Sequence, residues 1–214
     1  LGFAFDGDAD RCLCVDETGG VVDGDRMMSV LGLHMKKRGL LKNNRVVATV
    51  MSNMGFHAFM AEHGIALECA PVGDRNVLER MQRCGAVLGG EQSGHIIFLD
   101  TATTGDGQLA AVKFLSVVAA EKMPVSALTK TFAQYPQVMV NVPVQNHAKE
   151  AIMKSPRLQE AIRERERELG ESGRVLVRPS GTEPLIRVMA EAKEESLARE
   201  TVDCLVNVIK LLEF

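Results

Sequence analysis

The sequence predicts an α/β protein in two parts: a mixed, largely parallel βα domain followed by a smaller α+β domain. Two observations support this division. Up to Glu121, short apolar strands alternate with longer helical segments, an order typical of a parallel sheet covered by helices. Beyond Pro124 and Pro136, valines recur at every second position, which indicates a strand with one buried face. We therefore expect the domain boundary within residues 123–137.

The first part is expected to begin with a hairpin, because two short apolar runs flank Glu17-Thr18-Gly19-Gly20. A helix starts near Asp25 and ends at Gly39, after a cationic last turn. The remaining elements are predicted in this order: strand 46–50, helix 54–63, strand 65–70, helix 74–83, strands 86–88 and 96–99, and helix 107–121.

In the second part, strands and helices are predicted to alternate less regularly. Its expected elements are strand 138–144, a helix from Ser155-Pro156 to Gly170, strands 174–178 and 185–191, and a last helix spanning Ala198 to Leu212. The alternating Arg and Glu residues of 163–168 are interpreted as a solvated helix face with opposite charges three positions apart.

Composition excludes several classes of protein. The chain has 214 residues, with 25 Lys and Arg against 28 Asp and Glu, and this mildly acidic balance argues against a nucleic-acid partner. The sequence lacks an apolar run of the roughly 18 residues that a membrane span requires. The five cysteines lack any Cys-x-x-Cys pair, so we expect a reducing, cytoplasmic location. Because Leu1 stands where a start Met would, the chain is expected to begin within a longer protein.

Three carboxylates, Asp6, Asp8 and Asp10, alternate with small residues and precede Arg11. This spacing lets a loop bring their oxygens to one point, and hard oxygen ligands select Mg²⁺ or Ca²⁺. An EF-hand is disfavoured, because Arg11 stands at its required glycine position and 12–15 is predicted to be a strand. A plain acidic turn is the remaining alternative.

Two similar segments are not expected to be sites. Asp23-Gly24-Asp25-Arg26 directly precedes a predicted helix, so a turn and an N-cap explain it without a metal. Thr104-Gly105-Asp106-Gly107 is interpreted as the entry to the following helix.

A polar, glycine-rich segment, Gly89 to His95, lies between two predicted strands. Glycines let a ligand approach the backbone, and Glu91, Ser93 and His95 add an acid, a hydroxyl and an imidazole. Such a cluster suits a polyol, and a tight polar turn is the alternative.

The segment Arg178-Pro-Ser-Gly-Thr-Glu-Pro184, followed by Arg187, has the parts of a phosphate site. Hydroxyls, loop amides and guanidinium groups together satisfy the oxygens of a dianion. It lacks P-loop spacing, and a Pro/Gly turn between strands is the alternative.

In this order, the three motifs resemble the metal-binding, sugar-binding and phosphate-binding loops of the α-D-phosphohexomutase superfamily. Gln92 and Val72-Gly73-Asp74-Arg75 are most similar to the bacterial branch that acts on glucosamine phosphates. The resemblance covers the whole chain but only the later part of a four-domain protein. It implies that residues 1–16 are the tail of domain 2, 17–135 an α/β domain 3, and 136–214 a domain 4 resembling the TATA-box-binding protein.

The resemblance implies a role for each motif. The Mg²⁺ ligands would be Asp6, Asp8 and Asp10. The catalytic residues would be Arg11, which balances charge, and His95, a hydrogen-bond donor or proton carrier near the reacting end. The substrate contacts would be Asp74, Arg75, Glu91, Ser93, His95, Arg178, Ser180, Gly181, Thr182 and Arg187.

The resemblance also implies a reaction for the longer protein. A phosphoserine in domain 1 would convert glucosamine 6-phosphate to glucosamine 1-phosphate through a 1,6-bisphosphate, in the synthesis of UDP-N-acetylglucosamine. That serine has no counterpart here, so this chain alone is expected to be inactive without its N-terminal domains, and the longer protein could form a homodimer. The alternatives are a phosphomannomutase or phosphoglucomutase of the same superfamily and a non-catalytic phosphosugar-binding module. A phosphatase with Asp6 as nucleophile is disfavoured, because Asp10 stands where such enzymes usually carry Thr or Val.

Overall fold

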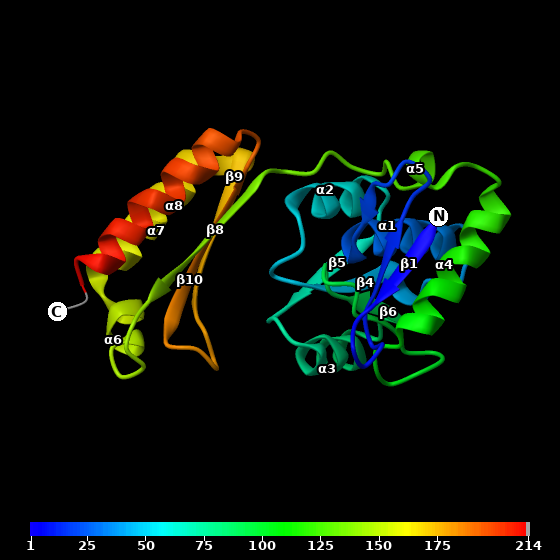
Figure 1. The fold of residues 1–214 in the computed structure, drawn as a ribbon, viewed down its shortest axis with the longest axis horizontal. Coiled ribbons are helices and arrows are strands. Elements are labelled where there is room, and N and C mark those ends of the chain that lie inside the picture. Colours follow the sequence, from blue (N-terminus) through cyan, green and yellow to red (C-terminus); the bar gives the residue numbers. More distant parts are fainter. Residues whose placement is uncertain (213–214) are drawn as a thin grey trace. The chain divides into compact units, whose positions relative to one another are not determined.

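The computed structural model describes residues 1–212, and the chain divides into two compact units, Leu1–Gln134 and Tyr135–Phe214 (Figure 1). Each unit has its own hydrophobic core. Among the described residues, no helix is long and apolar enough to cross a lipid bilayer.

Unit 1 holds most of the predicted βα elements. In chain order they are β1 (Gly2–Phe5), β2 (Cys12–Val15), β3 (Val21–Val22), α1 (Gly24–Lys37), η1 (Lys42–Asn44), β4 (Arg45–Thr49), α2 (Met54–Glu62), β5 (Ala66–Ala70), α3 (Asp74–Cys84), β6 (Leu88–Gly90), β7 (Ile96–Phe98), α4 (Gly107–Glu121) and α5 (Val125–Leu128). Strand β1 and the single turn α5 were not anticipated from the sequence.

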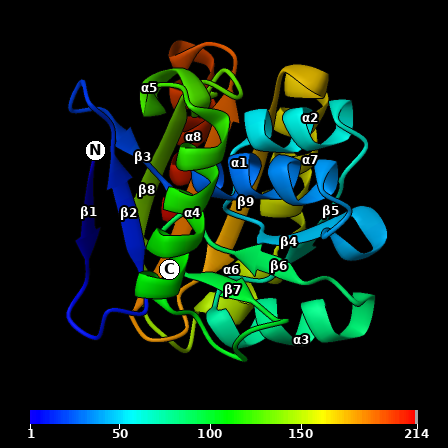
Figure 2. The same cartoon turned by 90° about the vertical axis from the view of Figure 1, so that its right-hand side faces the viewer.

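The central sheet of unit 1 has the strand order β5-β4-β6-β7. Strand β4 pairs in parallel with β5 and β6, whereas β6 and β7 are antiparallel. Figure 2 shows α1 and α2 over one face of this sheet and α3 over the other. Both faces are buried, since Val46 and Ala48 belong to the main core while Val47 packs in the core under α3. The prediction of a mixed, largely parallel sheet covered by helices is confirmed.

Strand β6 differs from its prediction. It spans Leu88–Gly90 rather than 86–88, so two glycines that the sequence suggested were loop are strand residues. Close packing explains their presence: a Cβ on Gly89 would lie 2.6 Å from the sulfur of Met81, and one on Gly90 would lie 2.4 Å from the carbonyl oxygen of His95. Side chains at these positions would collide with α3 and with the neighbouring turn.

Unit 2 is the smaller α+β domain, as predicted. Its elements are β8 (Gln137–Pro143), α6 (Lys149–Lys154), α7 (Pro156–Leu169), η2 (Gly170–Ser172), β9 (Gly173–Pro179), β10 (Leu185–Ala192) and α8 (Glu195–Lys210). The strands form an antiparallel sheet in the order β8-β10-β9, and α7 and α8 pack on one face of it (Figure 1). Ala198, Val202, Leu205 and Ile209 of α8 are buried there.

Two details of unit 2 depart from the prediction. Helix α6 was not anticipated. Ser155 occupies the N-cap position of α7 and Pro156 begins the helix, but within the described residues the Ser155 side chain makes no capping hydrogen bond.

Candidate active site

The acidic loop joins β1 to β2. The two strands pair as far as Phe5 and Cys12, and between them Ala9 takes a left-handed conformation (φ 58°) that bends the chain back. One oxygen from each of Asp6, Asp8 and Asp10 lies within 4.8 Å of the others. The fold therefore brings the three carboxylates to one point.

The acidic loop carries excess negative charge. The Arg11 Nε lies 3.6 Å from Oδ2 of Asp6 and 3.9 Å from Oδ1 of Asp10, so one guanidinium lies near two of the three carboxylates. Burial, followed by the charges of Asp8 and Asp6, raises the pKa of Asp10 above its usual value. Its Oδ1 is buried and accepts no hydrogen bond from any described residue. Oxygen ligands about 2.1 Å from Mg²⁺ lie about 3–4 Å apart, so a small contraction of this cluster would accommodate the ion. The residues present fit Mg²⁺.

The start of α4 supports the acidic loop. The Gly107 N–H donates to the carbonyl oxygen of Ala9 (3.0 Å), and a Cβ on Gly107 would lie 2.8 Å from that same oxygen. The Asp106 carboxylate caps the helix by accepting from the Leu109 N–H (2.9 Å). Residues 104–107 are the helix entry that the sequence indicated. They also support the loop that carries the metal-ligand candidates, and the sequence did not reveal this contact.

The polar turn between β6 and β7 lies against the other side of the acidic loop. The Cys12 N–H donates to the carbonyl oxygen of Gly94 (3.1 Å), and Arg11 and His95 form a β-bridge. Gly94 has φ +93°, and a Cβ there would lie 2.3 Å from the Cys12 oxygen. The two loops are thus joined backbone to backbone, which fixes the distance between Arg11 and the polar turn.

The predicted sugar contacts line two separate hollows of unit 1. Arg11, Glu91 and Ser93 line one of about 290 Å³. Asp74, Arg75 and His95 line another of about 200 Å³. Oε1 of Glu91 accepts the Gly73 N–H (3.0 Å), so this carboxylate connects the polar turn to the start of α3, where Asp74 and Arg75 lie.

His95 is buried between the acidic loop and the entry to α4. Its side chain is only 3% exposed, its Nε2 lies 3.6 Å from Oδ2 of Asp10, and a Cβ on Gly105 would lie 2.3 Å from that Nε2. Neither ring nitrogen has a hydrogen-bond partner among the described residues. The imidazole is therefore held in place by packing and by the nearby carboxylate.

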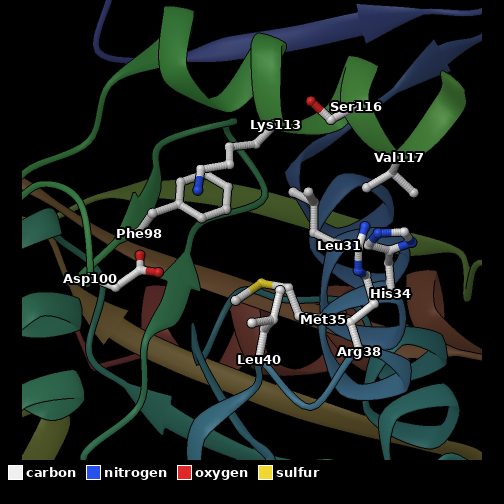
Figure 3. Close-up of a pocket in the computed structure, with 10 residues that line it drawn as sticks. All are labelled: Leu31, His34, Met35, Arg38, Leu40, Phe98, Asp100, Lys113, Ser116 and Val117. Atoms are coloured by element: carbon white, nitrogen blue, oxygen red, sulfur yellow. The ribbon is translucent and has the colours of Figure 1, made fainter. Parts of the chain in front are cut away.

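A third hollow, of about 190 Å³, lies between α1, β7 and α4 (Figure 3). Leu31, Phe98 and Val117 contribute apolar surface, and the Lys113 ammonium lies 5.5 Å from the centroid of the Phe98 ring. None of the predicted site residues lines this hollow.

The phosphate-loop candidate, residues 178–187, lies in unit 2 where β9 turns into β10. Arg178 and Arg187 are directly opposed in the strand register. Burial and the nearby Arg187 lower the pKa of Arg178. Arg187 Nη2 donates to Oε2 of Glu183 (2.7 Å), and its buried Nε has no acceptor among the described residues. Two guanidinium groups with one carboxylate leave a net positive charge suited to an anion.

One residue of this loop region was missed by the sequence reasoning. Lys149, the first residue of α6, is buried, and its ammonium donates to the carbonyl oxygens of Ser180 (2.8 Å) and Glu183. A lysine 31 positions before Ser180 carries no sequence signal that distinguishes it from a surface lysine.

Profiles of one family match both units. The profile described as phosphoglucomutase/phosphomannomutase, alpha/beta/alpha domain III, matches residues 23–135, and that of the C-terminal domain matches residues 139–208. The chain belongs to the phosphoglucomutase/phosphomannomutase family.

Curated members of this family are similar over nearly the whole chain. The phosphoglucosamine mutase of Carboxydothermus hydrogenoformans is 54% identical over 212 residues, which cover 99% of this chain and 47% of that protein. That of Frankia alni is 50% identical over 210 residues, covering 98% and 46%. The chain thus spans about half the length of the curated relatives it matches.

Solved structures of the family share the fold. The complex of Aspergillus fumigatus N-acetylphosphoglucosamine mutase with GlcNAc-6P and magnesium aligns with a TM-score of 0.79 and 22% identity, covering 99% of this chain and 49% of that one. This agreement extends to both units and supports the predicted fold class.

Proposed function

We propose that this family member is the C-terminal part of a Mg²⁺-dependent phosphoglucosamine mutase. The complete enzyme would interconvert glucosamine 6-phosphate and glucosamine 1-phosphate through a phosphoserine and a 1,6-bisphosphate. The observation that carries the proposal is the joining of the acidic loop to the polar turn, which places Arg11, Glu91 and Ser93 around one hollow. The relatives of 50–54% identity named phosphoglucosamine mutases support the choice of sugar.

The acidic loop would hold the metal. Asp6, Asp8 and Asp10 are the ligand candidates, and the Aspergillus enzyme with the same fold is described as a magnesium complex. When bound, Mg²⁺ would offset the negative charge of the phosphoryl group in transfer. Arg11, already between two of the carboxylates, would add a second cation at this end of the hollow.

The polar turn would hold the sugar. Glu91 and Ser93 would bind hydroxyl groups, with Asp74 and Arg75 as further contacts from the start of α3. His95 would donate a hydrogen bond or carry a proton near the reacting end, because its imidazole is held 3.6 Å from a carboxylate oxygen of the acidic loop.

The loop of unit 2 would hold the phosphate that is not being transferred. Its contacts would be Arg178, Ser180, Gly181, Thr182 and Arg187. A mutase must accept its substrate in two orientations, and one fixed anion site serves both because it recognises only a phosphate dianion.

The part of the relatives that this chain does not match would supply the phosphoserine. Residues 1–214 alone are then expected to be inactive, and the partners would be a phosphosugar and the N-terminal domains. The complete protein would act in the cytoplasm, in UDP-N-acetylglucosamine synthesis, and could form a homodimer.

A chimera tests the proposal. The unmatched N-terminal half of the Carboxydothermus enzyme is joined to residues 1–214, and conversion of glucosamine 6-phosphate is measured with Mg²⁺. We expect turnover by the chimera, a loss of about 10²-fold or more on Asp8→Asn, and none by residues 1–214 alone. Turnover by the separate chain would contradict the role assigned to the phosphoserine.

The same chimera separates the alternatives. Conversion of glucose or mannose phosphates in clear preference to glucosamine 6-phosphate would indicate a phosphoglucomutase or phosphomannomutase. A folded chimera that binds these phosphates without converting any of them, and without binding Mg²⁺, would indicate a phosphosugar-binding module.

A further inference from the structure

Lys149 connects α6 to both ends of the phosphate loop. Its side chain is buried, and its ammonium donates to the carbonyl oxygens of Ser180 (2.8 Å) and Glu183. These two carbonyls flank Gly181 and Thr182, two exposed residues of the loop. A single side chain thus fixes the two points from which the loop tip projects.

The contact with Ser180 also sets the direction of a neighbouring amide. The carbonyl of Ser180 and the N–H of Gly181 belong to one planar trans peptide group, so they point in opposite directions. With the oxygen turned toward Lys149, the Gly181 N–H points away from α6. Within the described residues this N–H has no protein acceptor, so it remains available to a ligand.

The charge of Lys149 is not cancelled locally. Among residues 1–212 its ammonium forms no ion pair with a carboxylate, although burial of a charge without a counterion is costly. Arg178 and Arg187, on the two strands that the loop joins, add two more cations, against the carboxylate of Glu183 that pairs with Arg187. A bound anion would relieve this excess.

We propose that Lys149 is a positioning residue for phosphate binding. Its ammonium holds the carbonyls of Ser180 and Glu183 so that the Gly181 amide faces outward, and its charge strengthens the field at the loop. The proposal rests on the phosphate-binding role proposed above for residues 178–187.

The test compares two lysines of one helix in residues 1–214. Lys149→Met removes the buried ammonium, and Lys154→Met makes the same change at an exposed lysine that pairs with Glu150. Inorganic phosphate is titrated by calorimetry, and the Gly181 amide is followed by NMR. We expect Lys149→Met to weaken phosphate binding about tenfold or more and to shift the Gly181 amide, because hydrogen bonds to charged groups are lost. Lys154→Met should stay within about twofold of the parent chain.

A conservative variant separates positioning from simple packing. Lys149→Arg keeps the cation and its donors, so it should recover part of the lost affinity, whereas Lys149→Met should not. If Lys149→Met does not fold, Lys149→Gln replaces it, since its shorter side chain keeps neutral N–H donors but removes the charge. Phosphate affinity unchanged in a folded Lys149→Met or Lys149→Gln chain would overturn the inference. Absence of phosphate binding by the parent chain would instead contradict the proposed function.

Discussion

Arg178 and Arg187 lie directly opposite each other across the β9–β10 ladder. Like charges in register destabilise a strand pair, and burial together with Arg187 lowers the pKa of Arg178. Glu183 offsets part of this charge through its ion pair with Arg187 (2.7 Å). The two arginines therefore repel each other in the ligand-free protein, and a bound dianion would offset this repulsion. An anion site is expected to behave in this way.

Replacing Arg178 should separate binding from stability. Arg178→Gln removes one of the opposed charges, so the ligand-free chain should unfold at the same temperature or a slightly higher one. Phosphate affinity should fall by about tenfold or more, because a charge-assisted hydrogen bond is lost. Thermal unfolding with increasing phosphate measures both effects, and Arg199→Gln, at an exposed ion pair on α8, is the control. An Arg178→Gln chain that phosphate stabilises as strongly as the parent chain would exclude this residue from the site.

Replacing Asp10 should change the unfolding temperature of the metal-free chain. Its pKa is raised, chiefly by burial and then by Asp8 and Asp6. A carboxyl with a raised pKa in the folded state contributes stability while it is protonated, and this contribution is lost as pH rises through that pKa. At neutral pH without a cation, Asp10→Asn should therefore raise the unfolding temperature by about 1–3 °C.

The same substitution should remove the response to Mg²⁺. In the parent chain, Mg²⁺ should raise the unfolding temperature, because the ion binds the folded state only. Scanning calorimetry with and without Mg²⁺ measures this, and Asp203→Asn, an exposed acid on α8, makes the same change of charge elsewhere. If Mg²⁺ stabilises Asp10→Asn as much as the parent chain, Asp10 is not a ligand.

Local signals in the sequence predicted most elements because their causes are local. Helix α4 spans the predicted range, residues 107–121. The acidic cap Asp106 marks its start, and its apolar residues mark its length. Contacts between distant segments carry no such signal. Asp25 is interpreted from sequence as part of a turn, yet it is fully buried and accepts hydrogen bonds from the Ser52 hydroxyl and the Asn53 N–H, both at 2.7 Å.

The candidate site was also predictable only where its residues are adjacent in sequence. The three motifs were visible because each is contiguous in sequence. Lys149 was not visible, because its role depends on its contacts with the carbonyls of Ser180 and Glu183. Gly105 was interpreted only as part of a helix entry, and its close approach to the His95 ring carries no sequence signal. The division of the sugar contacts between two hollows was likewise not predictable, because it depends on how β7 and α3 pack.

Gly24 should be intolerant of any side chain. A Cβ there would lie 2.0 Å from the carbonyl oxygen of Glu91, and the Gly24 N–H donates to the Gln92 oxygen (2.9 Å). Gly24→Ala must push the polar turn away from α1, so we expect a loss of about 2–4 kcal/mol of unfolding free energy. Urea denaturation measures it, with Gly2→Ala, where a Cβ would meet nothing within 4 Å, as a control expected within about 0.5 kcal/mol. Equal stability of the two variants would show that the turn can move without cost.

Cys12 and Cys14 should resist alkylation until the chain unfolds. Both are fully buried in the main core, and burial is the chief cause that raises the pKa of each thiol from 9.0 to about 11. The thiolate is the reactive form, so at pH 8 iodoacetamide should modify exposed Cys69 first. Mass spectrometry of tryptic peptides with and without urea measures the order. Modification of Cys12 at the rate of Cys69 in the folded chain would show that the β1–β2 hairpin opens readily, and the acidic loop it carries would then lack a fixed geometry.

The same two thiols should make stability depend on pH. Because their pKa values are higher in the folded than in the unfolded state, the free energy of unfolding should fall as pH rises from about 9 to about 11.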